Sequence, residues 1–444
     1  MRIKKVFKSI VVGYMALAVF ATCVVGPNCL ADVSEPEMLK NINSEGNGSP
    51  GDFTALNNEL YFDADDGAHG EELWKTDGTA GGTVLVKDIY SGENSSEPRR
   101  FIVFNNALYF AADDGENGLE LWKTDGTEEG TVLVKDINGG EDSDPDYFAV
   151  FNNALYFAAD DGDGELGHGV ELWKTDGTEE GTVLVKDIND GDDSWLSELV
   201  VFDDALYFSA DDGVNGYELW RTDGTEEGTA MVKDICVGAD GGVQNLVVWG
   251  DTLYFQGFDG DGDGAHGNEL WKTDGTEEGT VLVKDIRNGE ASSYPNNFTA
   301  LAGALYFTAN DGVNDRELWK TDGTEEGTTM VKDIKEGGDS APSGFTVFNN
   351  ALYFSADDGV NGTELWKTDG TPAGTELLKD INGGGNSSPQ YFTVFNNALY
   401  FQADDGANGF ELWNTDGTSV GTVLVKDIDG SGNGSPSYLT VLGN

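Results

Sequence analysis

Apolar residues recur along this chain in short runs, and each run ends in a cluster of glycine, asparagine or aspartate. The segment 345–381 shows four such runs: FTVF, ALYFSA, ELWKT and TELLKDI. Short β-branched and aromatic runs between turn residues are typical of β-strands. Asn349-Asn350 separates the first two runs by the two residues of a tight hairpin turn. The pattern therefore predicts a four-stranded antiparallel meander, whose strands are called A, B, C and D in chain order.

This meander occurs eight times. Each copy carries a Glu-Leu-Trp triplet, and the tryptophans lie 47 to 51 residues apart. They are Trp74, Trp122, Trp173, Trp220, Trp271, Trp319, Trp366 and Trp413. Neighbouring residues of a strand point to opposite faces, so the adjacent Leu365 and Trp366 require that both faces of each sheet be covered. Radial packing of such sheets meets this requirement. We predict an all-β fold, an eight-bladed β-propeller of 47–51-residue repeats.

Partial copies of the repeat flank the eight complete ones. The sequence MLKNI at 38–42 is similar to a strand D, and SYLTVLGN at 437–444 is similar to a strand A. Either spare segment could join the first or the last blade and close the ring. The predicted propeller domain covers residues 32–444.

The motifs ELWKTDGT and GTVLVKDI resemble those of the bacterial ELWxxDGT-repeat proteins, and the resemblance covers residues 38–444. It implies an exported, propeller-like repeat protein and brings no catalytic residue, because the motif of that family is the repeat itself. The order of a Leu-Tyr-Phe run and a glycine loop is also similar to kelch repeats. Since ELWKTDGT occurs in every copy, we assign it to packing and turn formation.

Residues 1–31 have the pattern of a secretory signal peptide. Four basic residues precede an apolar run from residue 10 to about residue 25, and Cys29-Leu30-Ala31 supplies the small residues of a cleavage site. Its removal would leave Cys236 as the one cysteine, so packing or ions must stabilise the fold in place of disulfides. We expect a secreted, cell-surface or periplasmic monomer without a membrane span.

The chain is strongly acidic, with 81 Asp and Glu against 25 Lys and Arg and a net charge of −56. Such a surface repels nucleic acid and anionic lipid and attracts divalent or cationic partners. The sequence DGDGDGAHGNE supports one cation in particular, Ca²⁺, because Asp259, Asp261 and Asp263 alternate as in calcium-binding loops. Glu269 follows near the position of the last calcium ligand. A looser version of the loop contains Asp161, Asp163 and Glu165. The alternative interpretation is a solvated acidic hairpin.

The three histidines, His69, His168 and His266, share one repeat position, where other copies have asparagine. We interpret them as turn residues that tolerate the left-handed region, and not as metal ligands.

The loops between strands D and A diverge most among the copies, and in a propeller they lie on the same face as the B–C loops. Trp195 stands in such a loop without a counterpart in the other copies. Tyr294, Tyr147, Arg99 and Arg100 belong to equivalent loops. Exposed aromatic residues and arginines are common in recognition surfaces, so these five are the predicted binding residues. The alternative is that Trp195 folds back onto its blade.

We therefore expect a non-catalytic binding or scaffold module whose partner is an extracellular glycan, a protein or a component of the cell envelope. One alternative is a carboxylate-based hydrolase or lyase. With three histidines in the chain, its acid–base chemistry would fall to Asp or Glu, and the sequence selects no pair among them. A second alternative is a purely structural surface spacer.

Overall fold

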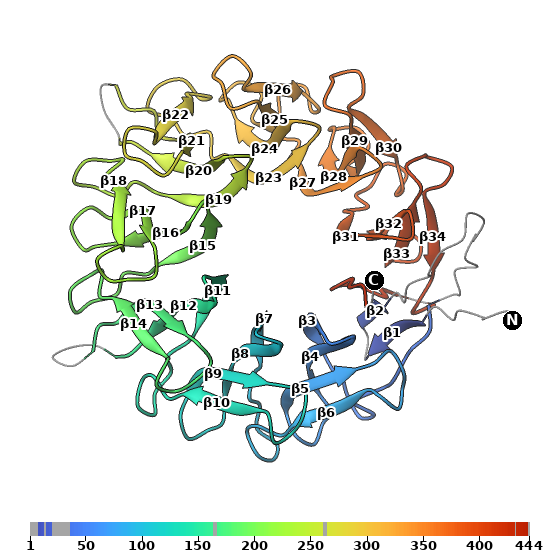
Figure 1. Cartoon of the computed structure of the whole chain (residues 1–444). Helices are drawn as coiled ribbons and strands as arrows, with labels where there is room; N and C mark the ends of the chain where they lie inside the picture. Colours follow the sequence, from blue (N-terminus) through green and yellow to red (C-terminus); the bar gives the residue numbers. More distant parts are fainter. Residues whose placement is uncertain are drawn as a thin grey trace, which may run out of the picture.

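The computed structural model describes residues 8–12, 15–19, 36–162, 167–260, 264–430 and 432–442. It forms a ring of eight four-stranded antiparallel sheets around a central channel, and all of its regular elements are strands (Figure 1). The predicted eight-bladed β-propeller is confirmed. Within each blade, strand A lies next to the channel and strand D lies at the outer rim (Figure 1).

The strands A to D of the blades follow one another in the chain. Blades 1 to 4 consist of β3 (Gly51–Leu56), β4 (Glu59–Asp65), β5 (Glu71–Thr76), β6 (Val84–Lys87); β7 (Arg99–Phe104), β8 (Ala107–Asp113), β9 (Leu119–Thr124), β10 (Val132–Lys135); β11 (Asp146–Phe151), β12 (Ala154–Asp160), β13 (Val170–Thr175), β14 (Val183–Lys186); and β15 (Ser197–Phe202), β16 (Ala205–Asp211), β17 (Tyr217–Thr222), β18 (Ala230–Lys233). Blades 5 to 8 consist of β19 (Gln244–Trp249), β20 (Thr252–Phe258), β21 (Asn268–Thr273), β22 (Val281–Lys284); β23 (Asn296–Leu301), β24 (Ala304–Asn310), β25 (Arg316–Thr321), β26 (Thr329–Lys332); β27 (Ser343–Phe348), β28 (Ala351–Asp357), β29 (Thr363–Thr368), β30 (Glu376–Lys379); and β31 (Gln390–Phe395), β32 (Ala398–Asp404), β33 (Phe410–Thr415), β34 (Val423–Lys426).

Turn chemistry accounts for the strand boundaries. Asn349 and Asn350 join β27 to β28 with φ values of 46° and 62°, as a type I′ hairpin turn requires. Strand D is shorter than the sequence predicted, since β30 ends at Lys379. The backbone N–H of Ile381 instead donates to the Glu364 carboxylate at 2.8 Å, which turns the chain out of the sheet.

The hydrophobic core is divided among the junctions between neighbouring blades. The junction of blades 1 and 2 contains the buried residues Leu56, Tyr61, Leu73, Val86, Ile89, Leu108, Phe110, Ala112 and Trp122. Lys87 on β6 lies over the Trp122 ring at 5.7 Å, and its Nζ donates to the Thr131 carbonyl at 2.7 Å. Each of the eight tryptophans fills space between neighbouring segments of the ring. Five of them also lie under a lysine ammonium group: Trp74, Trp122, Trp173, Trp366 and Trp413.

The sequence DGTxxGT forms the turn between strands C and D. In blade 2, Asp125 Oδ1 accepts hydrogen bonds from the Thr127 amide at 2.9 Å and from the Thr127 hydroxyl at 2.7 Å. The buried hydroxyls of Thr124 and Thr131 share a further hydrogen bond of 2.7 Å. A Cβ on Gly130 would lie 2.1 Å from Asp125 Oδ1, so only glycine fits there. Since every blade has this turn, these contacts explain why the sequence DGTxxGT recurs eight times.

Neither spare segment joins a sheet of blade 1 or blade 8, contrary to one expectation from the sequence. Each four-stranded sheet uses only its own consecutive strands. Lys40 Nζ donates to the Thr83 carbonyl of blade 1 at 2.6 Å, which matches the contact of Lys87 with blade 2. Lys426 of blade 8 donates in turn to the Pro36 carbonyl at 2.7 Å. Residues 36–42 therefore lie between blades 8 and 1, in the place of one additional strand D.

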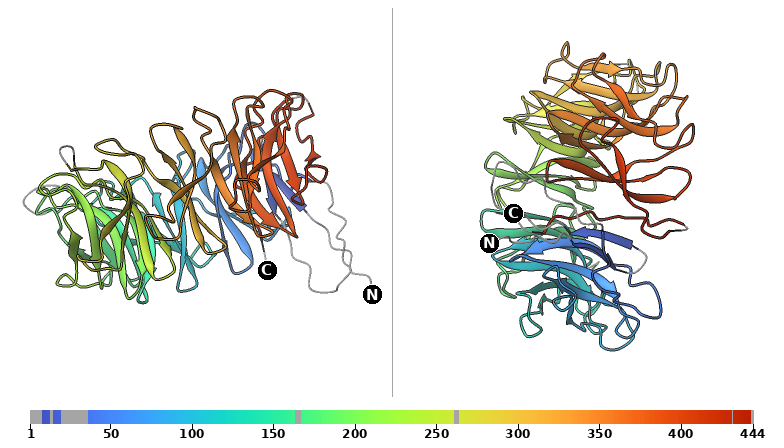
Figure 2. Two further views of the ribbon diagram at one scale, coloured as in Figure 1. Left: turned by 90° about the horizontal axis from the view of Figure 1, so that it is seen from above. Right: turned by 90° about the vertical axis from the view of Figure 1, so that its right-hand side faces the viewer.

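The N-terminal region contributes two short strands, β1 (Lys8–Val12) and β2 (Met15–Val19), which pair as an antiparallel hairpin. This hairpin lies between blades 8 and 1 in both views (Figures 1 and 2). Within the described ranges, no helix is long and apolar enough to cross a membrane.

Candidate functional site

The glutamate of each Glu-Leu-Trp triplet anchors the loop that leaves its own blade. Glu72 on β5 accepts hydrogen bonds from the Ile89 amide at 2.8 Å, the Tyr90 amide at 3.1 Å and the Ser96 hydroxyl at 2.7 Å. All eight of these glutamates have 0% exposure: Glu72, Glu120, Glu171, Glu218, Glu269, Glu317, Glu364 and Glu411. Burial raises the pKa of Glu72 to about 7, although its hydrogen bonds favour the ionised form.

Sequence reasoning missed this anchoring role, because it assigned the whole triplet to packing and turns. The signal was present as an acidic residue repeated in front of two apolar residues on a strand. A carboxylate in such a place needs buried donors, and the nearest candidates are the backbone amides and the serine of the D–A loop.

The anchored serine also connects two blades. The Ser96 amide donates to the Glu71 carbonyl at 3.0 Å, and the Ser96 carbonyl accepts from the Asp113 amide at 2.9 Å. The loop is thereby held between the start of strand C in blade 1 and the end of strand B in blade 2. The D–A and B–C loops consequently share one face, as the sequence predicted.

Large side chains emerge from this face at backbone positions with positive φ. Trp195 and Tyr294 directly follow the anchored serine, with φ of 46° and 50°. Tyr147 on β11, Tyr391 on β31 and Tyr438 in the C-terminal segment lie three residues further along the chain in their copies, with φ between 50° and 56°. Such conformations cost on the order of 1 kcal/mol each and persist where surrounding contacts impose them. The hydrogen bonds of the loop supply those contacts.

The aromatic side chains at these positions are exposed. Trp195 is 56% exposed and Tyr294 is 55% exposed. Trp195 therefore does not fold back onto its blade. Tyr147 lies on β11 and not in the D–A loop that the sequence predicted, whereas Trp195 and Tyr294 lie in two different loops. The three side chains therefore come from three different places around the ring.

The two predicted arginines contact neighbouring loops. Arg99 and Arg100 both reach Asp144, at 2.9 Å and 2.7 Å, and Arg100 also pairs with Asp146 at 3.1 Å. Both arginines stand at the start of β7 and not in the D–A loop that the sequence predicted. Their guanidinium groups are ion-paired with acidic residues at the start of blade 3, so less of their charge is available to a ligand.

One of the predicted residues, Tyr294, borders a large polar cavity of about 810 Å³. The lining is rich in side-chain amides from blades 5 and 6: Gln244, Asn245, Gln256, Asn268, Asn296 and Asn297. The Gln256 Nε2 donates to Asn268 Oδ1 at 3.2 Å, and the Asn268 amide donates to the Ser292 hydroxyl at 3.3 Å. Sequence reasoning did not find these amides, because they come from strands A, B and C as well as from the loops.

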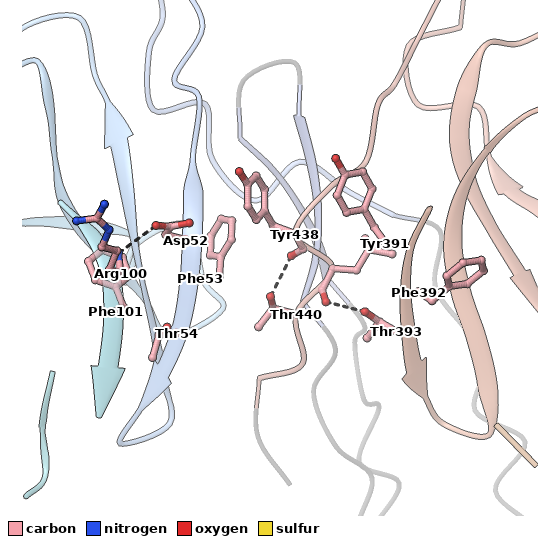
Figure 3. Close-up of a pocket in the computed structure, with 11 residues that line it drawn as sticks. Asp52, Phe53, Thr54, Arg100, Phe101, Tyr391, Phe392, Thr393, Tyr438 and Thr440 are labelled. Carbon is pink, nitrogen blue, oxygen red and sulfur yellow. Dashed lines mark hydrogen bonds between the residues drawn. The ribbon is translucent and has the colours of Figure 1, made fainter. Parts of the chain in front are cut away.

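A second cavity of about 450 Å³ lies where the ring closes (Figure 3). Tyr391 of blade 8, Tyr438 of the C-terminal segment and Arg100 of blade 2 line it. The Phe53 and Tyr438 rings lie 6.2 Å apart between their centroids. This cavity is more apolar than the one beside Tyr294.

Four of the predicted calcium ligands, Asp261, Asp263, Asp163 and Glu165, lie outside the described residues. The Asp259 carboxylate is described, and it accepts from the His266 amide at 2.7 Å and contacts His266 Nδ1 at 2.6 Å. Asp161 has the same relation to His168, with distances of 2.6 Å and 2.8 Å.

Glu269 is not part of the acidic loop. It is one of the buried anchors and accepts from the Ile286 amide at 2.9 Å and the Ser293 hydroxyl at 2.6 Å. Its assignment as a calcium ligand is corrected accordingly, since its carboxylate faces the D–A loop. Across the described ranges, no group of three or more His, Cys, Asp or Glu side chains could hold a metal ion.

The histidines are turn residues for a different reason than the one expected. The left-handed residue is the following glycine, such as Gly70 with φ of 71°. The histidine itself contributes through its side chain, because His69 Nδ1 contacts the Asp66 carboxylate at 2.8 Å. Asn117 makes the equivalent bond to Asp114, also at 2.8 Å. The hydrogen bond to Asp66 raises the pKa of His69.

No protein-family model matches the sequence, and the search of curated proteins found no match. Among solved structures, the computationally designed Ika8 protein has a TM-score of 0.45 and 18% identity, covering 83% of this chain and 97% of that protein. Puromycin hydrolase has a TM-score of 0.41 and 16% identity, covering 82% of this chain and 59% of that one. A puromycin-hydrolyzing peptidase of Mycobacterium tuberculosis has a TM-score of 0.43 and 9% identity, covering 89% of this chain and 54% of that one. The chain thus spans little more than half the length of these two hydrolases.

Proposed function

We propose that this protein is a non-catalytic binding module that takes a neutral, hydroxyl-rich ligand, such as a stretch of extracellular glycan, on the face of the B–C and D–A loops. The observation that carries the proposal is the amide-lined cavity beside Tyr294. A side-chain amide both donates and accepts, so a group of amides can satisfy the hydroxyls of a sugar.

Tyr294 supplies the second element of such a site. Its ring is 55% exposed and its backbone is held by a hydrogen bond of 3.2 Å from its amide to the Asn268 carbonyl. An exposed aromatic ring on a fixed loop can pack against the C–H face of a sugar ring. The cavity of about 810 Å³ is also within the size range of ligand sites in proteins.

The charge of the chain narrows the ligand class. With a net charge of −56, the protein repels polyanionic glycans. Arg316, a cation on the cavity wall, is paired with Asp339 at 3.2 Å. A neutral ligand therefore fits the site better than an acidic one.

The location of this activity is part of the proposal. The signal-peptide pattern of residues 1–31 and the resemblance to ELWxxDGT-repeat proteins both support an exported protein. Glycans of the cell surface or of the surroundings would then be accessible to it.

A hydrolase on the same face is the second candidate, and one carboxyl group favours it. Asp63 is 9% exposed on β4 and borders a small cavity together with Asp52 and Glu71. Burial and the neighbouring Glu71 raise the pKa of Asp63 to about 7, a value that suits a general acid. Hydrolysis of a polysaccharide that is lost in Asp63→Asn would establish this alternative.

The binding proposal is tested with a panel of neutral oligosaccharides, followed by calorimetric titration of those that bind. We expect Tyr294→Ala to weaken binding at least tenfold. Tyr391→Ala is the matched control, because Tyr391 has similar exposure, 47%, at the start of β31 in blade 8. The proposal is wrong if no neutral glycan binds, or if the two variants lose affinity equally.

A further inference from the structure

The amide-lined cavity beside Tyr294 is formed largely by blade 5, and blade 5 departs from the repeat at the residues that line it. At the last position of strand B it has Phe258, which lines the cavity. Gln256 stands two residues earlier on the same face of β20 and lines the cavity as well. The other blades have an acidic or an amide residue in place of Phe258: Asp65, Asp113, Asp160, Asp211, Asn310, Asp357 and Asp404. The cavity of blade 5 therefore has an apolar wall among its amides.

The absence of one side chain leaves room for this cavity. The residue that follows the position of the anchored serine has positive φ in every copy of the D–A loop, and in blade 5 it is Gly242, with φ of 55°. The other copies carry a side chain there: Ser49, Glu97, Asp144, Trp195, Tyr294, Ala341, Ser388 and Ser435. A Cβ on Gly242 would lie 3.1 Å from the Phe258 Cβ and 3.2 Å from Asn268 Oδ1. A side chain at this position would thus enter the cavity.

The equivalent cavity of blade 1 shows what these departures change. In place of Gly242, Gln256 and Asn268 it has Ser49, Asp63 and Glu71. Its volume is about 230 Å³, against about 810 Å³ in blade 5. The same place in the repeat is therefore small and acidic in blade 1, and large, uncharged at these positions and partly aromatic in blade 5.

Two side chains of the blade 5 cavity offer a matched acceptor and donor. Gln256 is 6% exposed and its Nε2 donates to Asn268 Oδ1 at 3.2 Å, so its Oε1 is the remaining acceptor. Asn296 Oδ1 accepts from the Thr308 hydroxyl, so the Asn296 Nδ2 is the remaining donor. Among the described residues, neither Gln256 Oε1 nor Asn296 Nδ2 has a hydrogen-bond partner.

The combination of an acceptor, a donor and an apolar wall suits an acetamido group. The N–H of such a group can donate to Gln256 Oε1, and its carbonyl oxygen can accept from Asn296 Nδ2. Its methyl group gains from contact with the Phe258 ring, because that contact removes apolar surface from water. A hydroxyl at the same carbon of a plain sugar has no apolar group to place against this ring.

We propose that the cavity of blade 5 selects an N-acetylated amino sugar. The acetamido group lies against Phe258, Gln256 and Asn296, and the sugar ring packs on Tyr294. Gly242 admits the ligand, because it leaves open the space that a side chain enters in the other copies of the loop. This inference rests on the proposed glycan binding and names the class of sugar within it.

The test compares two neutral trisaccharides of the same linkage, one of N-acetylglucosamine and one of glucose, by calorimetric titration of the full chain. We expect the acetylated trisaccharide to bind at least about tenfold more tightly, the effect of one buried methyl group and one additional hydrogen bond. Equal affinity for the two would overturn this inference and leave the glycan-binding proposal in place. Binding of neither would overturn both.

Variants of Phe258 test the apolar wall. Phe258→Asn introduces the residue of blade 6, where Asn310 accepts from the Gly312 amide at 2.7 Å, so the repeat itself accommodates this side chain. It should abolish the preference for the acetylated trisaccharide, whereas Phe258→Leu keeps an apolar side chain and should retain it. An unchanged preference in Phe258→Asn would overturn the inference.

A variant of Gly242 tests the space. Ser388 holds the equivalent position with φ of 45°, so this backbone accepts serine. Gly242→Ser should weaken the binding of both trisaccharides at least about tenfold. Ala341→Ser, the matched change in the loop between blades 6 and 7, should leave both affinities at the parental value, with circular dichroism showing that both variants fold. Parental affinity in Gly242→Ser would place the ligand outside this cavity and overturn the inference.

Discussion

Replacement of one buried anchor, Glu120→Gln, should increase the stability of this protein at pH 8. Glu120 is 0% exposed, and it accepts from the Asn138 amide at 3.2 Å, from the Ser143 hydroxyl at 2.6 Å and from the Ile137 amide. Glutamine has the shape of the protonated glutamate. Its oxygen can accept from the Asn138 and Ile137 amides, and its own amide can donate to the Ser143 oxygen.

The magnitude follows from the pKa of Glu120, which burial raises from 4.5 to about 7. A folded-state pKa above the unfolded-state value means that the folded chain holds this proton more tightly. The associated stability is fully present below pH 4.5 and is lost as the pH rises through 7. The ionised carboxylate therefore costs about 3 kcal/mol at pH 8 and under about 1 kcal/mol at pH 5. Glutamine does not titrate and avoids this cost.

The assay is urea unfolding followed by tryptophan fluorescence at pH 8 and pH 5. The Glu120→Gln protein should exceed the parent by up to about 3 kcal/mol at pH 8, and the difference should shrink by more than half at pH 5. Glu129→Gln removes the same charge from an exposed site and serves as the control for general electrostatics. Glu120→Ala should destabilise the protein by about 2–4 kcal/mol at both pH values, because it leaves three donors without their acceptor and creates a cavity.

A loss of stability in Glu120→Gln at both pH values would refute this reasoning. It would mean that the hydrogen bonds to the carboxylate outweigh its desolvation, so that the anchors are ionised below neutral pH. The other buried anchors would then stabilise the ring as charged groups.

Other consequences can be measured in the same way. In the first C–D turn, Gly82→Ala should destabilise blade 1 by about 1–3 kcal/mol, because its Cβ would lie 2.1 Å from Asp77 Oδ1, whereas Gly81→Ala has open space and should change little in thermal melting. His69→Asn should leave the melting temperature within about 1 °C of the parent, since Asn117 makes the equivalent bond to Asp114; His69→Ala should lower it, and an equal loss in both variants would contradict the turn assignment. Calcium at about 1 mM should stabilise the protein by about 2.7 kcal/mol over EDTA if a site of about 10 µM affinity exists; Asp261→Ala should abolish the shift, and no shift in the parent would leave the acidic loops as solvated turns.

Pattern reasoning was most successful where the decisive contacts lie within one hairpin. The Asn-Asn turns and the DGTxxGT turns depend on contacts within a few residues, such as those of Asp125 with Thr127. Their role can therefore be predicted from the sequence. It was less successful at contacts across 17 to 24 residues, such as Glu72 with Ile89 and Ser96, because a period shows that a residue recurs and not what it contacts.

The candidate site illustrates the same limit. Sequence divergence identified Tyr294 and Trp195, since both stand in variable loops. The amides beside Tyr294 come from several strands of two blades, and only the packing of blade 5 against blade 6 brings them together. The two predicted arginines are ion-paired with Asp144, a residue about 45 positions away, and the sequence does not show this pairing.

The chain order alone determined the repeat, the four strands of each blade and their turns, because these depend on local propensity and on a period that any eight copies would show. Tertiary structure decided how the ring closes. The contact of Lys426 with Pro36 joins residues 390 positions apart, and no local pattern contains it. The curvature of the ring brings the two ends of the repeat region together, where residues 36–42 and 437–442 lie between blades 8 and 1 outside the four-stranded sheets.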